Sequence, residues 1–240
     1  LFDVWRAAAP AVDFLAPDIY FPNFTEWAEK YALPGKPFLI PETGRVSGAQ
    51  MGANGLYAYA HLNAMGYSPY APEFLSPDDA KALGQAYDVV EQLTPLILAH
   101  QGSGKMVGML PRTQFDGSVD LSPQTFVFGD YKVTASYRKP GSASIGAKID
   151  ADTSTTHGGL IIQTGPNDCW FAGTGITVYF EPPGKGRSAV GIESIREGRF
   201  INGQWVPGRE MNGDDTNQGR HLSLPDDEFS IRRVTLYHYD

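Results

Sequence analysis

The sequence is poor in cysteine and in positive charge, and it has no long apolar run. Its single cysteine, Cys169, cannot form an internal disulfide, which leaves the redox compartment open. Its 19 Lys and Arg residues are outnumbered by 27 Asp and Glu residues, and the net charge of -8 argues against a nucleic-acid partner. No stretch approaches the roughly 20 consecutive apolar residues that a membrane-spanning helix needs. We therefore expect neither a membrane span nor bound nucleic acid.

Several motifs that hold cofactors or carry chemistry are also missing. No glycine-rich phosphate loop follows an apolar run, no GxSxG elbow is present, and the 5 histidines include no HxxxH pair. The acidic run at 213–217 (GDDTN) has too few regularly spaced oxygens for a calcium loop, and it reads as a solvated turn. We therefore expect no metal and no cofactor.

The composition is that of a folded protein with a substantial core. Of the 240 residues, 42% are hydrophobic and 12% are aromatic, which excludes an intrinsically disordered chain. The length fits one large domain or two ordinary ones. The chain begins at Leu1, inside a segment that reads as structured, with no initiator Met and no signal peptide. We expect it to be a fragment.

The first 112 residues alternate between apolar runs of strand length and runs with helical spacing. Strands are expected at 13–20, 36–42 and 66–70, and helices at 24–33, at 55–64 and from Ser76 onward. Ser76 followed by Pro and two Asp residues is typical of a helix N-terminus. Apolar strands separated by helices predict a parallel sheet covered by helices. Three such units in about 100 residues match the pitch of a (β/α)8 TIM barrel, although periodicity alone leaves a doubly wound sheet open.

After residue 112 the helical spacing disappears, and short alternating or β-branched runs follow one another. Strands are expected at 125–138, 159–164, 169–172, 175–181, 189–197, 204–210, 220–224 and 229–239. Asn202-Gly203 is a strong signal for a two-residue hairpin. This pattern predicts an all-β sandwich. The predicted division is therefore the C-terminal part of a barrel at 1–112 and a β-sandwich domain at 113–240.

One carboxylate and three tyrosines lie at the ends of the predicted parallel strands. Glu42 ends the apolar run KPFLIPE, Tyr20 ends the preceding strand, and Tyr67 and Tyr70 lie in and after the next one. In a barrel, catalytic side chains sit at the C-terminal ends of the strands. A carboxylate ringed by aromatic side chains is typical of a sugar-binding subsite, because sugars offer both apolar faces and hydroxyl groups. The alternative is that Glu42 only caps the turn into the next helix.

The runs DFLAPDIYFPNFTEWAEKY, GKPFLIPETGR and HLNAMGYSPYAPEF, followed by GDYKVTASY and EFSIRRVTLYHYD in the tail, resemble a family 35 glycoside hydrolase. The likeness is to the C-terminal part of bacterial β-galactosidases that carry a β-sandwich after the barrel, and it covers nearly the whole chain. The resemblance implies a retaining, exo-acting enzyme that removes terminal β-galactose without a cofactor. It implies Glu42 as the nucleophile at the end of strand seven and Tyr20 as its hydrogen-bond partner from strand six. Tyr67 and Tyr70 would shape the galactose subsite.

The resemblance also implies what the chain lacks. The acid/base glutamate of the family ends strand four, which would lie upstream of Leu1 with the rest of the barrel. We therefore expect the chain alone to be inactive, with an exposed strand-six edge and an uncovered inner sheet face. Because members of this kind often act outside the cytoplasm, an extracellular or periplasmic location is expected.

Two other functions stay open. The chain could belong to another β-glycosidase of the same clan, such as a mannanase or a glucanase, or it could be a non-catalytic carbohydrate-binding module. The second function would use aromatic side chains of the sandwich, for which core packing is the default. These side chains are Trp170, Phe171, Tyr179, Phe180 and Trp205. Two further carboxylates, Glu26 and Glu73, read as surface charges.

Overall fold

The computed structural model describes residues 2–44, 46–137, 155–184, 189–226 and 228–240, and every structural statement below concerns these residues. Helices lie over Phe2–Ala8 (α1), Phe24–Tyr31 (α2), Gly48–His61 (α3) and Pro77–His100 (α4), with 3-10 turns at Pro72–Phe74 (η1) and Gly213–Thr216 (η2). The helix start predicted at Ser76 is confirmed, since its side chain accepts a hydrogen bond from the backbone N–H of Asp79 at 3.2 Å.

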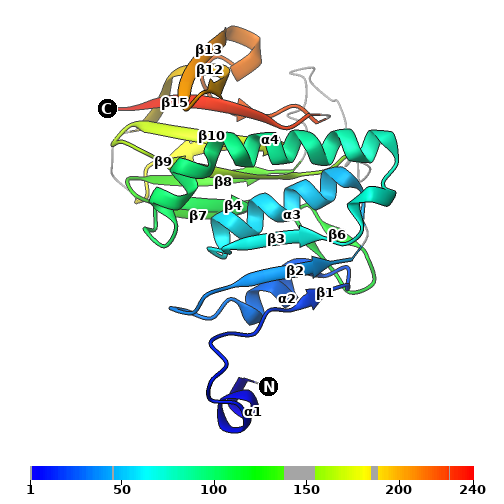
Figure 1. Cartoon of the computed structure of the whole chain (residues 1–240). Coiled ribbons are helices and arrows are strands. Elements are labelled where there is room, and N and C mark those ends of the chain that lie inside the picture. The colour runs from blue at the N-terminus through cyan, green and yellow to red at the C-terminus, as the bar shows by residue number, and fades with distance from the viewer. Residues whose placement is uncertain (1, 45, 138–154, 185–188, 227) are drawn as a thin grey trace.

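A small parallel sheet forms the first half of the molecule (Figure 1). Its strands are Asp18–Ile19 (β1), Leu39–Thr43 (β2) and Gly66–Pro69 (β3), in the order β1-β2-β3. The strand and helix order follows the sequence prediction, although β1 covers only the last part of the predicted strand. Ile19, Ile40 and Tyr67 are buried in a core shared with α2 and α3. In the part of the chain that the structure describes, this sheet is open, as expected for three strands, and no closed barrel is formed. That the three strands belong to a TIM barrel stays a prediction.

A larger antiparallel sheet forms the centre of the second half. Its strands run in the order β13-β12-β15-β10-β9-β4. Their bounds are Met106–Met109 (β4), Gly158–Gln163 (β9), Asp168–Thr174 (β10), Ala189–Ile201 (β12), Gln204–Met211 (β13) and Ser230–Tyr239 (β15). One face contributes Leu160, Ile162 and Ile231 to the same core as Leu93 and Ile97 of α4. Figure 1 shows the parallel sheet on one side of α3 and strands β12, β13 and β15 on the far side of α4.

A second antiparallel sheet covers the other face of the large sheet. It consists of Gln124–Phe128 (β7), Tyr131–Ser136 (β8), Thr177–Glu181 (β11) and Leu222–Ser223 (β14), in the order β14-β11-β8-β7. Val133 and Val178 from this sheet and Phe171 and Val234 from the large sheet share one buried core. The two sheets therefore face each other as the layers of a sandwich.

Most aromatic side chains considered for a carbohydrate-binding face belong to the interior. Trp170, Phe171 and Phe180 are buried. Trp205 packs edge-on against Trp170, with ring centroids 4.7 Å apart. Core packing therefore accounts for these four residues.

Glycines set two of the turns between antiparallel strands. Asn202 and Gly203 join β12 to β13 with φ of 52° and 75°, which is the left-handed geometry of a two-residue hairpin, and the sequence prediction of this hairpin is confirmed. The strand predicted at 125–138 is instead two strands, β7 and β8. They are separated at Gly129, whose φ of 54° favours glycine.

α3 is rich in glycine and alanine because other elements approach it closely on several sides. A Cβ on Gly55 would lie 3.1 Å from the ring of Tyr67 in β3. A Cβ on Gly52 would lie 2.3 Å from the Cβ of Ala86 in α4, and a Cβ on Gly158 in β9 would lie 2.4 Å from the Cβ of Ala53. Larger side chains at these points would push the helix away from its neighbours.

The described residues thus form a mixed fold of helices, one parallel sheet and mainly antiparallel sheets. β4 precedes the predicted division at residue 112 and yet pairs with β9 in the large sheet. The division into 1–112 and 113–240 stays a prediction. No helix within the described ranges has the length and apolar character needed to cross a bilayer.

Candidate functional site

The carboxyl ends of the three parallel strands meet at one edge of the sheet. The register pairs Asp18 with Glu42, and Ile19 with Thr43. Beyond the strands, the N–H of Gly44 donates to the carbonyl of Ile19 at 2.7 Å, and the N–H of Tyr70 donates to the carbonyl of Thr43 at 3.1 Å. These bonds fix the segments that follow β1, β2 and β3 beside one another.

Glu42 points away from the helices. Its neighbour Thr43 is buried and donates to the hydroxyl of Tyr67 at 3.3 Å, on the side that α2 and α3 cover. Thr43 is in register with the buried Ile19, and Glu42 is in register with the exposed Asp18, so Glu42 belongs to the opposite, open face of the sheet. The residue is half-buried there.

Tyr20 and Tyr70 lie on either side of β2 at the same edge. Their rings meet edge to face, with centroids 6.1 Å apart and planes at 61°. Tyr20 is 50% exposed and Tyr70 is 48% exposed, although each is large enough to contribute to a core. The structure therefore places Tyr20, Glu42 and Tyr70 at the same strand ends, where the two tyrosine rings contact each other.

Tyr67 occupies a different place from the other two tyrosines. It is buried under the sheet, where its ring packs edge to face on Phe24 at 6.1 Å and its hydroxyl accepts the hydrogen bond from Thr43. Burial raises the pKa of its phenol well above the ordinary value. Tyr67 supports β2 from the helix side, and a direct contact between Tyr67 and a substrate stays a prediction.

Asp18 is a residue at this edge that sequence reasoning missed. It is exposed and lies in register with Glu42 on the neighbouring strand, where paired strands are roughly 4.8 Å apart. The signal was available, because alternation in the run DIY places Asp18 and Tyr20 on one face. Only the pairing of β1 with β2 tells that this face is also the face of Glu42.

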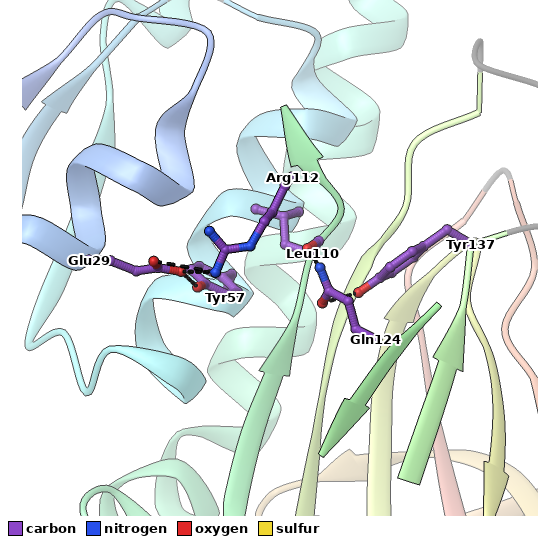
Figure 2. A network of polar contacts seen from close by, with 6 residues as sticks. All are labelled: Glu29, Tyr57, Leu110, Arg112, Gln124 and Tyr137. Atoms are coloured by element: carbon purple, nitrogen blue, oxygen red, sulfur yellow. Dashed lines mark hydrogen bonds and ion pairs between the residues drawn. The ribbon is translucent and has the colours of Figure 1, made fainter. Parts of the chain in front are cut away.

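Two sets of polar contacts lie where the helices meet the second half (Figure 2). The Tyr57 hydroxyl of α3 donates to Glu29 of α2 at 2.8 Å, and Arg112 donates to the same carboxylate at 3.1 Å. Nearby, the Tyr137 hydroxyl donates to the Gln124 side chain at 2.6 Å. The Gln124 amide in turn donates to the Leu110 carbonyl at 2.9 Å, so that β7, β8 and the chain after β4 are joined.

The remaining candidates agree with plain structural roles. Glu26 is exposed and accepts hydrogen bonds from Lys30 at 2.6 Å and from Asn23 at 2.7 Å, and these contacts lower the pKa of its carboxyl. Glu73 is exposed on η1. Cys169 is fully buried, and burial raises the pKa of its thiol to about 12, which suits a packing residue rather than a nucleophile. No cluster of three metal-binding side chains occurs among the residues that the structure describes.

The described residues form a mixed α and β fold. A parallel sheet, which carries a carboxylate at its strand ends, is joined to an antiparallel sandwich. The chain belongs to the family described as a domain of unknown function, DUF5597, whose profile matches residues 83–223. This match begins in α4 and reaches the end of β14, which is more than half of the chain. Glu42 and the three tyrosines precede the matched residues. No curated protein matches the sequence.

Proposed function

We propose that the chain is part of a retaining glycoside hydrolase of the family 35 type, an exo-acting β-galactosidase that removes terminal β-galactose from oligo- or polysaccharides. The observation that carries the proposal is the open face of the parallel sheet. There the half-buried Glu42 shares the strand ends with the exposed rings of Tyr20 and Tyr70, which contact each other. A carboxylate near exposed aromatic rings offers both a nucleophile and an apolar surface for a sugar.

In the proposed reaction, the Glu42 carboxylate attacks the anomeric carbon of the galactoside. The bond from that carbon to the leaving oxygen breaks, and the leaving oxygen takes a proton from an acid. Water then attacks the same carbon, gives its proton to the same residue acting as base, and releases the sugar from Glu42. Tyr20 would orient the carboxylate, and Tyr70 would contact the sugar ring beside it.

The acid/base residue is proposed to come from a polypeptide segment outside residues 1–240. Retaining enzymes use two carboxyl groups about 5 to 5.5 Å apart that flank the scissile bond. Asp18 and Glu42 instead project side by side from neighbouring strands of one sheet. Asp18 therefore reads as a neighbour of the nucleophile and not as its partner across the bond. The open edge of β1 is compatible with pairing to a further strand.

The test is made in a polypeptide that carries these residues together with the acid/base segment. Incubation with a 2-deoxy-2-fluoro-β-galactoside should label the peptide that contains Glu42, as detected by mass spectrometry. Glu42→Gln should abolish labelling and lower turnover by at least about 10³-fold, because the covalent step is lost. Glu73→Gln is the matched control, since Glu73 is an exposed glutamate on η1, and it should leave both unchanged. Normal turnover of Glu42→Gln would refute the proposal.

A mannanase or a glucanase of the same clan would use the same nucleophile at the same edge. Aryl glycosides separate these activities, because only a β-galactosidase should release the aryl group from the β-galactoside at high rate. Release from the mannoside or the glucoside alone would move the proposal to the corresponding activity and keep the role of Glu42.

A further inference from the structure

A cavity of about 230 Å³ lies where the helices meet the second half, and residues of both sets of polar contacts in Figure 2 line it. Its lining residues, whose neighbours along the chain are also described, are Thr25 of α2, Tyr57 and His61 of α3, Leu110 and Arg112 after β4, and residues 124–126 of β7. An engineered cavity of roughly 150 Å³ in another protein holds benzene, so this cavity has room for a molecule with a single ring.

The apolar part of the wall is aromatic. The imidazole of His61 stacks on the ring of Tyr57, with centroids 4.8 Å apart and planes at 19°. Phe126 lies edge-on to His61, with centroids 6.4 Å apart. Rings from α3 and from β7 therefore meet at this cavity, and their flat faces and edges favour a ligand that is itself flat.

The polar part of the wall offers hydrogen-bond donors that have no use within the described ranges. Arg112 reaches Glu29 through Nη2 alone, at 3.1 and 3.4 Å, and no described group accepts from its Nε or its Nη1. Thr25 is only 3% exposed, yet its hydroxyl has no hydrogen-bond partner in the described part of the chain. The same holds for both ring nitrogens of His61. A buried hydroxyl without a partner is costly, and a ligand that accepts from it would remove this cost.

Arg112 gives the wall a positive charge. No carboxylate occurs among the described lining residues, because Glu29 approaches Arg112 from outside the cavity. The ion pair of these two residues is weak, since the Arg112 side chain is 54% exposed and the Glu29 side chain is 32% exposed. A ligand carboxylate can therefore share the guanidinium with Glu29. Its two oxygens suit a wall that is rich in donors.

We propose that this cavity binds a small carboxylate that carries a single flat ring, a molecule of the size of benzoate. The carboxylate pairs with Arg112, the ring packs against His61 and Phe126, and the Thr25 hydroxyl donates to an oxygen of the ligand. Glu42 does not line this cavity. The inference therefore goes beyond the proposed function and does not rest on it.

The test is a titration of isotope-labelled chain 1–240 with benzoate and, in parallel, with benzamide, followed by NMR at pH 7. We expect benzoate to shift the ring signals of His61 and the backbone signals of residues 124–126. Benzamide has nearly the same shape and no charge, and it should bind at least about tenfold more weakly. Arg112→Gln should weaken benzoate binding about tenfold, which corresponds to 1.4 kcal/mol. Thr25→Val keeps the shape of the side chain and should weaken it about threefold, the size of one lost hydrogen bond.

Glu29→Gln separates ligand binding from a merely structural role of Arg112. The Glu29 carboxylate competes with the ligand for the guanidinium, so its removal should tighten benzoate binding by about threefold. If Arg112 served only to hold Glu29, this variant would bring no gain in affinity.

Arg196→Gln is the matched control. Arg196 is 49% exposed and pairs with Glu210 at 2.8 Å, and it does not line the cavity. This variant should bind benzoate like the unchanged chain, and so should Glu42→Gln. Normal benzoate binding by an intact enzyme that is not labelled at Glu42 would refute the proposed function and leave the carboxylate site standing.

Four results would overturn the inference. The first is the absence of any shift with benzoate, and the second is benzoate binding that Arg112→Gln leaves unchanged. The third is benzamide binding as tight as that of benzoate, which would identify an apolar slot without charge recognition. The fourth is inorganic phosphate binding as tight as that of benzoate, which would identify an anion site that does not use the rings.

Discussion

Tyr57 is the side chain whose loss should most clearly weaken the junction between the helices and the second half. It is 4% exposed, and its hydroxyl donates to the Glu29 carboxylate at 2.8 Å. A hydrogen bond to a charged group contributes about 1.5 to 3 kcal/mol to stability. In Tyr57→Phe the carboxylate keeps Arg112 at 3.1 Å, and the Glu29 side chain is 32% exposed, so water can replace part of the lost contact. We therefore expect a loss at the lower end, about 1 to 2 kcal/mol.

Arg112 provides the internal comparison. Its side chain is 54% exposed, and an ion pair at such a position contributes about 0 to 1 kcal/mol. Arg112→Gln should therefore cost less than Tyr57→Phe, although both partners bind the same carboxylate. Tyr70→Phe, at an exposed position, should change the free energy of unfolding by no more than about 0.5 kcal/mol.

The assay is urea unfolding of chain 1–240, followed by circular dichroism, with the double variant Tyr57→Phe/Glu29→Gln to obtain the coupling energy. A loss of 1 kcal/mol corresponds to a decrease of about 2 to 4 °C in Tm for a chain of this size. A smaller loss for Tyr57→Phe than for Arg112→Gln would refute the reasoning that burial decides the strength of these two contacts.

Two further predictions concern the buried tyrosines and α3. Burial raises the pKa of Tyr57 and of Tyr137 far above the unfolded value of about 10. The stability contributed by each buried, protonated phenol is therefore fully present below pH 10. Above pH 10, each phenol should lower the free energy of unfolding by about 1.4 kcal/mol per pH unit, as measured by unfolding between pH 9 and pH 11. A free energy of unfolding that stays constant over this range would contradict the pKa assignment. Gly52→Val should cost about 1 to 3 kcal/mol in thermal unfolding, because the added Cβ would lie 2.3 Å from the Cβ of Ala86, and an unchanged Tm would contradict the close packing of α3 on α4.

Local signals in the sequence were sufficient where one residue decides the structure. Ser76 predicts the start of α4 because its hydroxyl accepts from the backbone N–H of Asp79, and Asn202-Gly203 predicts its hairpin because few residues tolerate positive φ. The apolar run at 125–138 misled for the opposite reason. Its periodicity continues through Gly129, and only the positive φ of that glycine reveals that the chain reverses there.

The sequence predicted the candidate site only to the extent that it predicted where the parallel strands end. Glu42, Tyr20 and Tyr70 follow from their places after apolar runs. Tyr67 was grouped with them because sequence proximity does not tell which face a side chain takes. The irregularity between Ile40 and Thr43 in the pairing of β2 with β3 changes the alternation at this point. Asp18 escaped attention because its proximity to Glu42 exists only through the pairing of two strands that are far apart in the sequence.

The contact between the rings of Phe21 and Phe115 spans an even longer stretch of chain. Phe21 and Phe115 are separated by more than 90 positions, and neither lies in a recognisable motif. Their rings meet because Phe115 lies in the hairpin of Arg112–Thr113 (β5) and Val119–Asp120 (β6), and β5 packs against α2. Long-range contacts of this kind depend on the whole topology and not on local propensity.

The position of α3 has a consequence for dissecting this protein. One face of α3 lies against Tyr67 of the parallel sheet, and another lies against Gly158 of the large antiparallel sheet. A truncation between residues 112 and 113 would remove α3, α4 and the edge strand β4 together, and would expose Leu160, Ile162 and Ile231 to water. The smallest portion expected to stay soluble therefore begins before Gly48. Such a portion would contain the antiparallel sheets together with α3 and α4, and these two helices would form its outer layer.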